Sequence, residues 1–133
     1  MLAVDTNVVV RFLVNDDAAQ HRRAVALFRK HEIWLAKTVL LESEWVLRTA
    51  FEFTAQEIGA ALQGLLGLPN VRCEDGRAVA TALEGLAAGL DFADALHLSG
   101  CQAAGADEGF ATFDVRFIKR AQRQWPGIAV RVP

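Results

Sequence analysis

Short apolar runs alternate with longer amphipathic segments along the whole chain. Runs of three to five residues that end in polar or turn-forming residues predict strands. The predicted strands are residues 2–4, 33–36, 71–73, 109–113 and 128–132. Segments with helical periodicity lie between them. The predicted helices are residues 8–14, 15–30, 38–51, 54–67, 75–88, a segment that opens at 91, and 114–124. This alternation predicts an α/β fold with a short, mostly parallel sheet flanked by helices on both faces.

Length and composition favour one globular domain over residues 1–133. The chain is 53% hydrophobic and 23% charged, which is too apolar for a disordered protein. No apolar run approaches the roughly 18 residues that would span a bilayer. Asp5 and Arg11 interrupt the first apolar stretch, which argues against a signal peptide. Cys73 and Cys101 have no metal-ligand spacing and are expected to be reduced core thiols of a cytoplasmic protein.

Charge is distributed unevenly along the chain. The net charge is −2, so the protein has no overall basic field of the kind that marks many nucleic-acid-binding proteins. Residues 115–133, however, contain five basic residues and no acidic one. Four of the five have the spacing of one helical face, namely Arg116, Lys119, Arg120 and Arg123. This face is either simply solvated or a contact surface for a phosphate backbone.

Two aspartates occupy positions where parallel α/β folds place their ligands, and a third lies at the start of a helix. Asp5 and Asp114 each follow a predicted strand and precede a helix. Helix capping explains both residues equally well. Asp94 is expected in the first turn of a helix that Asp91 caps, where the helix dipole alone would favour it.

Glu42 is a fourth acidic candidate because of its neighbours on the predicted helix. Val39, Trp45 and Val46 lie one turn away from it. A carboxylate buried against these apolar side chains would need a partner, because burying a charge alone is expensive. Glu44, by contrast, has Arg48 one turn on, and we expect an exposed ion pair there.

The four acids together permit metal chemistry. If the fold brings Asp5, Glu42, Asp94 and Asp114 together, a cation must offset their mutual repulsion. Oxygen ligands of this kind select Mg²⁺ or Mn²⁺. Such an ion activates water and stabilises charge on a phosphodiester. Spacing alone does not show that the four acids converge.

Four segments resemble the PIN-domain ribonuclease family and, within it, the VapC toxins of bacterial toxin–antitoxin pairs. They are residues 4–7 (VDTN), 39–48 (VLLESEWVLR), 91–97 (DFADALH) and 111–114 (ATFD). Their order and separation fit the family over essentially the whole chain.

The resemblance implies a site, a cofactor and partners. The family's acidic quartet maps onto Asp5, Glu42, Asp94 and Asp114. The polar residues that support this quartet in the family, here called polar helpers, map onto Thr6, Asn7 and Thr112. It implies Mg²⁺ or Mn²⁺, hydrolysis of single-stranded or looped RNA, and a homodimer. It also implies a VapB-like antitoxin that reaches the acids with a basic residue. The basic face at 116–123 would contact the RNA backbone without sequence preference.

The roles of a few other residues stay open at this point. His97 follows Asp94 by three residues and either faces the site or is structural. Trp34, Trp45 and the phenylalanines are expected in the core. Trp125, beside the basic face, is a candidate platform for stacking bases.

Two other classes of function compete with the nuclease. A receiver-like domain would bind Mg²⁺ through Asp5 and accept a phosphoryl group on another aspartate. Such a domain usually carries a lysine at the end of its last strands, and Lys119 instead lies on a predicted helix. The third class is a binding-only protein with an inactive site, against which the intact quartet argues.

Overall fold

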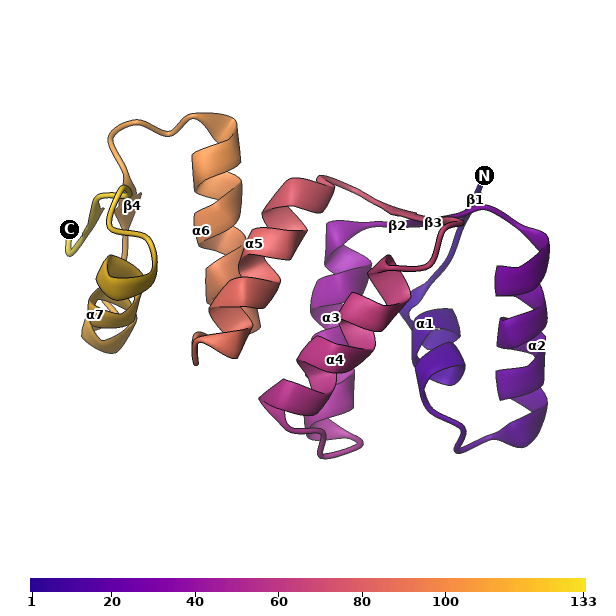
Figure 1. Cartoon of the computed structure of the whole chain (residues 1–133). Coiled ribbons are helices and arrows are strands. Elements are labelled where there is room, and N and C mark those ends of the chain that lie inside the picture. Colours follow the sequence, from indigo (N-terminus) through magenta and orange to yellow (C-terminus); the bar gives the residue numbers. More distant parts are fainter. The chain divides into compact units, whose positions relative to one another are not determined.

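The computed structural model describes residues 1–133 as seven helices and five strands (Figure 1). All twelve elements that the sequence pattern predicts are present, in the predicted order. The chain forms two compact units, residues 1–76 (unit 1) and residues 77–133 (unit 2). No helix is long and apolar enough to cross a membrane.

Unit 1 is built on a three-stranded parallel sheet. Its strands are β1 (Leu2–Ala3), β2 (Ile33–Leu35) and β3 (Val71–Cys73), hydrogen-bonded in the order β1-β2-β3. Each crossover is made by two helices, as parallel pairing requires. The crossover helices are α1 (Thr6–Leu13), α2 (Ala18–Lys30), α3 (Lys37–Thr49) and α4 (Ala55–Leu66). Helix α1 packs against α2 and α3, and α3 packs against α4.

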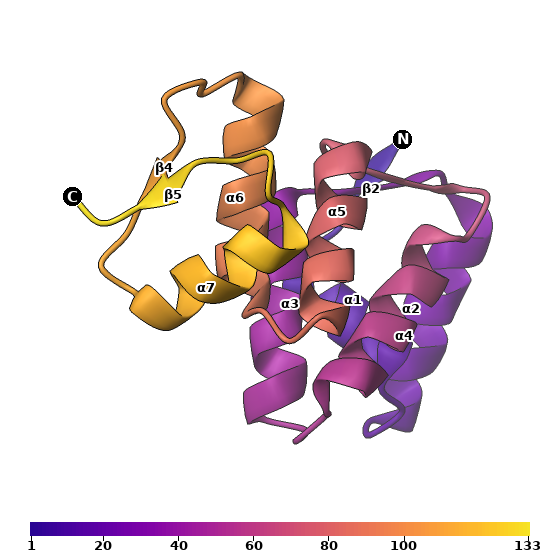
Figure 2. The ribbon, with the colours of Figure 1, turned by 60° about the vertical axis from the view of Figure 1, so that its left-hand side comes forward.

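Unit 2 consists of three helices and a two-stranded parallel sheet. Its helices are α5 (Gly76–Ala87), α6 (Phe92–Ala104) and α7 (Val115–Gln124). Its strands β4 (Phe110–Ala111) and β5 (Val130–Arg131) pair through Phe110 with Val130 and Ala111 with Arg131. Figure 2 shows the chain leaving β4, forming α7 and returning as β5 beside β4. The Phe110 and Phe117 rings meet edge to face at 5.7 Å and join β4 to α7.

Side-chain caps fix where most of these helices begin. Thr54 and Glu57 form the capping box at the start of α4 that the sequence predicts. Asp5, Asp91 and Asp114 accept a backbone hydrogen bond at the first turns of α1, α6 and α7. The largest differences from the predicted bounds are at α1, which begins at residue 6 rather than 8, at α2, which begins at 18 rather than 15, and at β4 and β5, which each cover two residues rather than five. The earlier start of α1 follows from Asp5, which caps the helix directly.

A glycine on α5 allows close packing inside unit 2. A Cβ atom at Gly85 would lie 2.6 Å from the Trp125 ring and 2.9 Å from the Ala95 Cβ atom. Real Cβ atoms do not approach other atoms so closely. Only glycine therefore allows α5, α6 and the segment after α7 to pack as they do.

We expect Gly85→Ala to lower the free energy of unfolding by about 1–3 kcal/mol, as overpacking a filled interior does. The measurement is chemical denaturation of the purified variant. Gly59→Ala is the matched control, because it also adds a methyl group to a helix but meets nothing within 4 Å. That control should be stabilised by roughly 0.5–1 kcal/mol, the helix preference for alanine over glycine. Equal effects of the two substitutions would contradict the packing role of Gly85.

Candidate functional site

Asp5 and Asp114 share one local geometry. Each follows a strand, β1 or β4, and each caps the helix that comes next. One carboxylate oxygen of Asp5 accepts from the Thr6 backbone N–H at 2.6 Å, and one of Asp114 accepts from the Phe117 N–H at 3.0 Å. Both side chains are exposed, and their second oxygens have no hydrogen-bond partner. Capping therefore occupies half of each carboxylate and leaves an oxygen free for a ligand.

Asp94, in the first turn of α6, lies in an environment that disfavours its charge. It is half-buried, and this burial is the main reason that its pKa is raised above the usual value. The negative charges of Asp91 and Asp114 raise the pKa further, while His97 opposes them. Asp91, Asp94 and Asp114 are thus electrostatic neighbours within unit 2.

Asp91 is the N-cap of α6, as the sequence predicts. Its carboxylate accepts a hydrogen bond from the Asp94 backbone N–H at 3.2 Å. His97 lies one turn after Asp94 and is exposed. Its side chain makes no hydrogen bond or ion pair within the protein, and its described interaction is the electrostatic one with Asp94.

The two glutamates of α3 have the opposite environments to those predicted. Glu42 is exposed, whereas Glu44 is only 3% exposed and accepts from the Arg48 Nε at 2.8 Å. The predicted ion pair of Glu44 with Arg48 is confirmed, but the expectations that Glu42 is buried and that Glu44 is exposed are wrong. The buried stripe of α3 consists of Leu40, Ser43, Glu44 and Leu47. Glu42 lies outside that stripe and has no partner, so its carboxylate is open to a ligand.

The polar helper positions differ in what surrounds them. Thr6 is buried, and its hydroxyl oxygen has no hydrogen-bond partner. The Thr112 hydroxyl accepts from the Asp114 backbone N–H at 3.0 Å and so orients the loop that carries Asp114. Asn7 is exposed at the start of α1. Of the three, only Thr112 already has a positioning contact within the protein.

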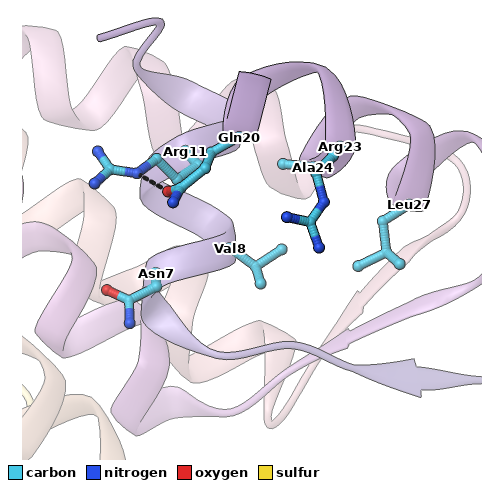
Figure 3. A pocket seen from close by; sticks show the side chains of 7 residues that line it. All are labelled: Asn7, Val8, Arg11, Gln20, Arg23, Ala24 and Leu27. Atoms are coloured by element: carbon cyan, nitrogen blue, oxygen red, sulfur yellow. Dashed lines mark hydrogen bonds between the residues drawn. The ribbon is translucent and has the colours of Figure 1, made fainter. Parts of the chain in front are cut away.

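Asn7 borders a pocket of about 270 Å³ between α1 and α2 (Figure 3). The pocket also includes Arg11, which donates to Gln20 at 2.6 Å and to Asp16 at 2.8 Å. Arg23 lines it as well and has no ion-pair partner. Because no carboxylate lines this pocket, it is not a metal site.

The acidic quartet divides equally between the two units. Asp5 and Glu42 belong to unit 1, and Asp94 and Asp114 belong to unit 2. In neither unit do three His, Cys, Asp or Glu side chains gather closely enough to hold a metal ion. The donor chemistry nevertheless fits a hard divalent cation, because all four groups are carboxylates. Thr6, the residue after Asp5, has a buried hydroxyl without a hydrogen-bond partner.

The basic face predicted at residues 116–123 lies on helix α7. Arg116, Lys119, Arg120 and Arg123 are all exposed. Arg120 donates to the Gly89 carbonyl at 2.8 Å, so part of its donor capacity is already used. The other three have no ion-pair or hydrogen-bond partner within the protein and remain available to an anionic ligand.

The prediction of a core position is right for Phe28, Phe92 and Phe117, which are buried, but wrong for two other aromatic side chains. Phe113 is 80% exposed and Trp45 is 56% exposed, although both were expected in the core. Trp125, the predicted stacking platform, is half-buried, and its ring lies against Gly85. Phe113 lies between Thr112 and Asp114, two positions that the sequence assigns to the site. Cys73 and Cys101 are free thiols, as predicted, but are half-buried rather than in the core.

These observations define a class of protein: parallel α/β, with carboxylates that follow strands and begin helices. The PIN domain profile matches residues 2–123, which cover nearly all of unit 1 and most of unit 2. The chain belongs to the PIN domain family, whose members are generally metal-dependent nucleases. No curated protein sequence matches the chain closely enough to show a relative. Membership of this family gives no support to the receiver-like alternative.

Proposed function

We propose that the protein is a Mg²⁺- or Mn²⁺-dependent endoribonuclease of the VapC toxin type. The PIN domain match supports the nuclease activity, and one feature of unit 2 supports the metal requirement. Asp94 is held half-buried while the charges of Asp91 and Asp114 oppose its ionisation. A bound cation would relieve that repulsion. The direct test is incubation of the purified protein with single-stranded RNA, which should be cleaved in Mn²⁺ and left intact in EDTA.

In this proposal the carboxylates of Asp5, Glu42, Asp94 and Asp114 hold the metal. When bound, the ion would supply an activated water and stabilise charge on the phosphodiester. The residues around the acids hold them in place. The Thr112 hydroxyl orients Asp114, and Asp91 fixes the start of the helix that carries Asp94.

The partners of the proposed nuclease are an RNA, a second copy and an antitoxin. We propose that the chain forms a homodimer and that a VapB-like antitoxin silences it. Such an antitoxin would reach the acids with a basic side chain, and Asp5, Glu42 and Asp114 are exposed carboxylates without an ion-pair partner. We also propose that residues 1–133 act as one PIN domain. The profile match across both units supports this organisation.

The basic face of α7 should bind the RNA backbone. Each phosphate contact on a single strand contributes about −0.7 to the slope of log affinity against log salt concentration. Replacing Arg116, Lys119 and Arg123 by glutamine should therefore weaken binding and reduce the magnitude of that slope by roughly 2. Fluorescence anisotropy of a labelled single-stranded RNA at several salt concentrations, with EDTA present, measures both effects.

A matched charge change on another helix controls for the loss of net charge. Arg22, Arg29 and Lys30 are exposed residues of α2 without ion-pair partners. Their replacement by glutamine removes the same total charge but should leave the salt slope almost unchanged. An equal loss of slope in the two triple variants would show that only net charge matters and that α7 is not the contact surface.

A further inference from the structure

Phe113 is a large apolar side chain that the fold leaves in solvent. It is 80% exposed, at the turn from β4 to α7. A phenylalanine of this exposure gives up most of the free energy that its burial would provide. The aromatic contact between β4 and α7 is made by Phe110 and Phe117 and does not include Phe113. The exposed ring is therefore free for contact with a ligand.

The backbone on both sides of this ring is fixed. The Thr112 N–H donates to the Arg131 carbonyl at 2.9 Å and holds the turn to strand β5. The Asp114 N–H donates to the Thr112 hydroxyl at 3.0 Å, and the Asp114 carboxylate caps α7. A ring held on a rigid turn loses little conformational freedom on binding, which favours recognition of a partner.

The groups beside Phe113 indicate the chemistry of that partner. Asp114, a proposed metal ligand, is its direct neighbour. Helix α7, which starts at the same turn, carries three basic side chains without a partner within the protein: Arg116, Lys119 and Arg123. An aromatic ring beside a row of cations is the arrangement with which proteins hold single-stranded nucleic acid: cations follow the phosphates, and rings stack on bases. A purely apolar protein partner would not use this charge.

We propose that Phe113 stacks on an unpaired base of the RNA, next to the phosphodiester that the acidic site engages. This role rests on the proposed ribonuclease function and makes Phe113 a positioning residue for single-stranded substrate. A base inside a duplex is already stacked on both faces and does not offer one to the ring. Double-stranded RNA should therefore gain nothing from Phe113.

The test measures the coupling between the ring and a base. The probes are a 12-nucleotide single-stranded RNA and a set of the same RNAs in which one nucleotide at a time is abasic. Binding is measured with EDTA present, so that no cleavage occurs. Phe113→Ala should weaken binding of the intact RNA by roughly 5- to 150-fold, the equivalent of about 1–3 kcal/mol per stacked base. Removing the contacted base from the RNA should weaken binding by the wild-type protein by a similar factor. It should not further weaken binding by the Phe113→Ala variant.

Two further variants separate stacking from simple apolar contact. Phe113→Trp should retain the affinity, while Phe113→Leu should lose most of it. Val115→Ala is the matched control, because Val115 is also an exposed apolar residue beside Asp114 but has no ring. It should bind RNA like the wild-type protein. All four proteins should unfold at similar temperatures, because both side chains are exposed.

The possible outcomes distinguish this proposal from the function on which it rests. If the wild-type protein neither binds nor cleaves RNA, the ribonuclease function itself is wrong. If the protein cleaves RNA but the effects of Phe113→Ala and base removal are additive, the stacking role is wrong and the nuclease stands. If Phe113→Ala changes the oligomeric state in sedimentation and leaves RNA affinity intact, the ring belongs to an interface between copies of the chain.

Discussion

We expect Asp94→Asn to abolish metal-dependent RNA cleavage while the protein remains folded. Loss of a group that merely orients a metal ligand already costs 10- to 100-fold in metal affinity or activity. Loss of a ligand itself should therefore reduce cleavage by at least about 100-fold. Asparagine keeps the size of the side chain, so α6 should form normally. Cleavage of labelled RNA in Mn²⁺, together with circular dichroism of the variant, measures both parts of this expectation.

The same variant should lose the stabilisation that metal gives to the protein. At a tenfold excess over its Kd, a metal that binds only the native state adds about 1.4 kcal/mol, or a few degrees in Tm. Wild-type protein should show this increase between EDTA and Mn²⁺, and Asp94→Asn should not. This measurement needs no knowledge of the target RNA.

Without metal, Asp94→Asn should no longer lower the stability of the protein relative to the wild type. The raised pKa of Asp94 means that the folded protein binds its proton more tightly than the unfolded chain does. The ionised carboxylate thus lowers stability, and that loss develops as pH rises through the usual carboxylate range and is complete above the raised pKa. In EDTA at neutral pH, Asp94→Asn should therefore be at least as stable as the wild-type protein.

Asp91→Asn is the matched control for Asp94→Asn. It also neutralises a carboxylate on α6, but Asp91 acts as the helix cap, and asparagine caps as well as aspartate. It should keep both cleavage and the metal-induced rise in Tm. Equal loss of activity in the two variants would show that Asp91 also belongs to the metal site. A normal response of Asp94→Asn to metal would remove Asp94 from the ligands.

The two glutamates of α3 should differ in what they contribute to stability. We expect Glu44→Gln to lower the free energy of unfolding by about 1.5–3 kcal/mol, the contribution of a buried hydrogen bond between charged groups. The cost should stay below the 3–5 kcal/mol of a fully buried ion pair, because the Arg48 side chain is 47% exposed and can be hydrated. Chemical denaturation measures the difference.

Glu42→Gln should give the opposite result. Its side chain is exposed and has no partner, so its stability should stay within about 0.5 kcal/mol of the wild-type value. Its cleavage activity should fall as that of Asp94→Asn does. Should Glu44→Gln instead abolish cleavage at unchanged stability, Glu44 would replace Glu42 as the metal ligand.

This pair of glutamates shows where reasoning from sequence fails. Periodicity identifies which residues of a helix share a face, but it does not decide which face points inward. On α3 one candidate stripe carries Val39, Trp45 and Val46, and the other carries Leu40 and Leu47. The prediction placed the first stripe against the core, whereas the structure buries the second together with Glu44. The contact with Arg48 allows that burial, because it satisfies the carboxylate.

The sequence by itself determined the twelve elements, the helix caps and the family. These features depend on interactions between residues close in the chain: apolar periodicity, side-chain caps within three residues, and short motifs in a fixed order. Only the tertiary structure decided that Glu44 rather than Glu42 is buried, that Trp125 packs on Gly85, and that Phe113 remains in solvent. Those outcomes depend on which distant segments meet, and a local pattern does not contain that information.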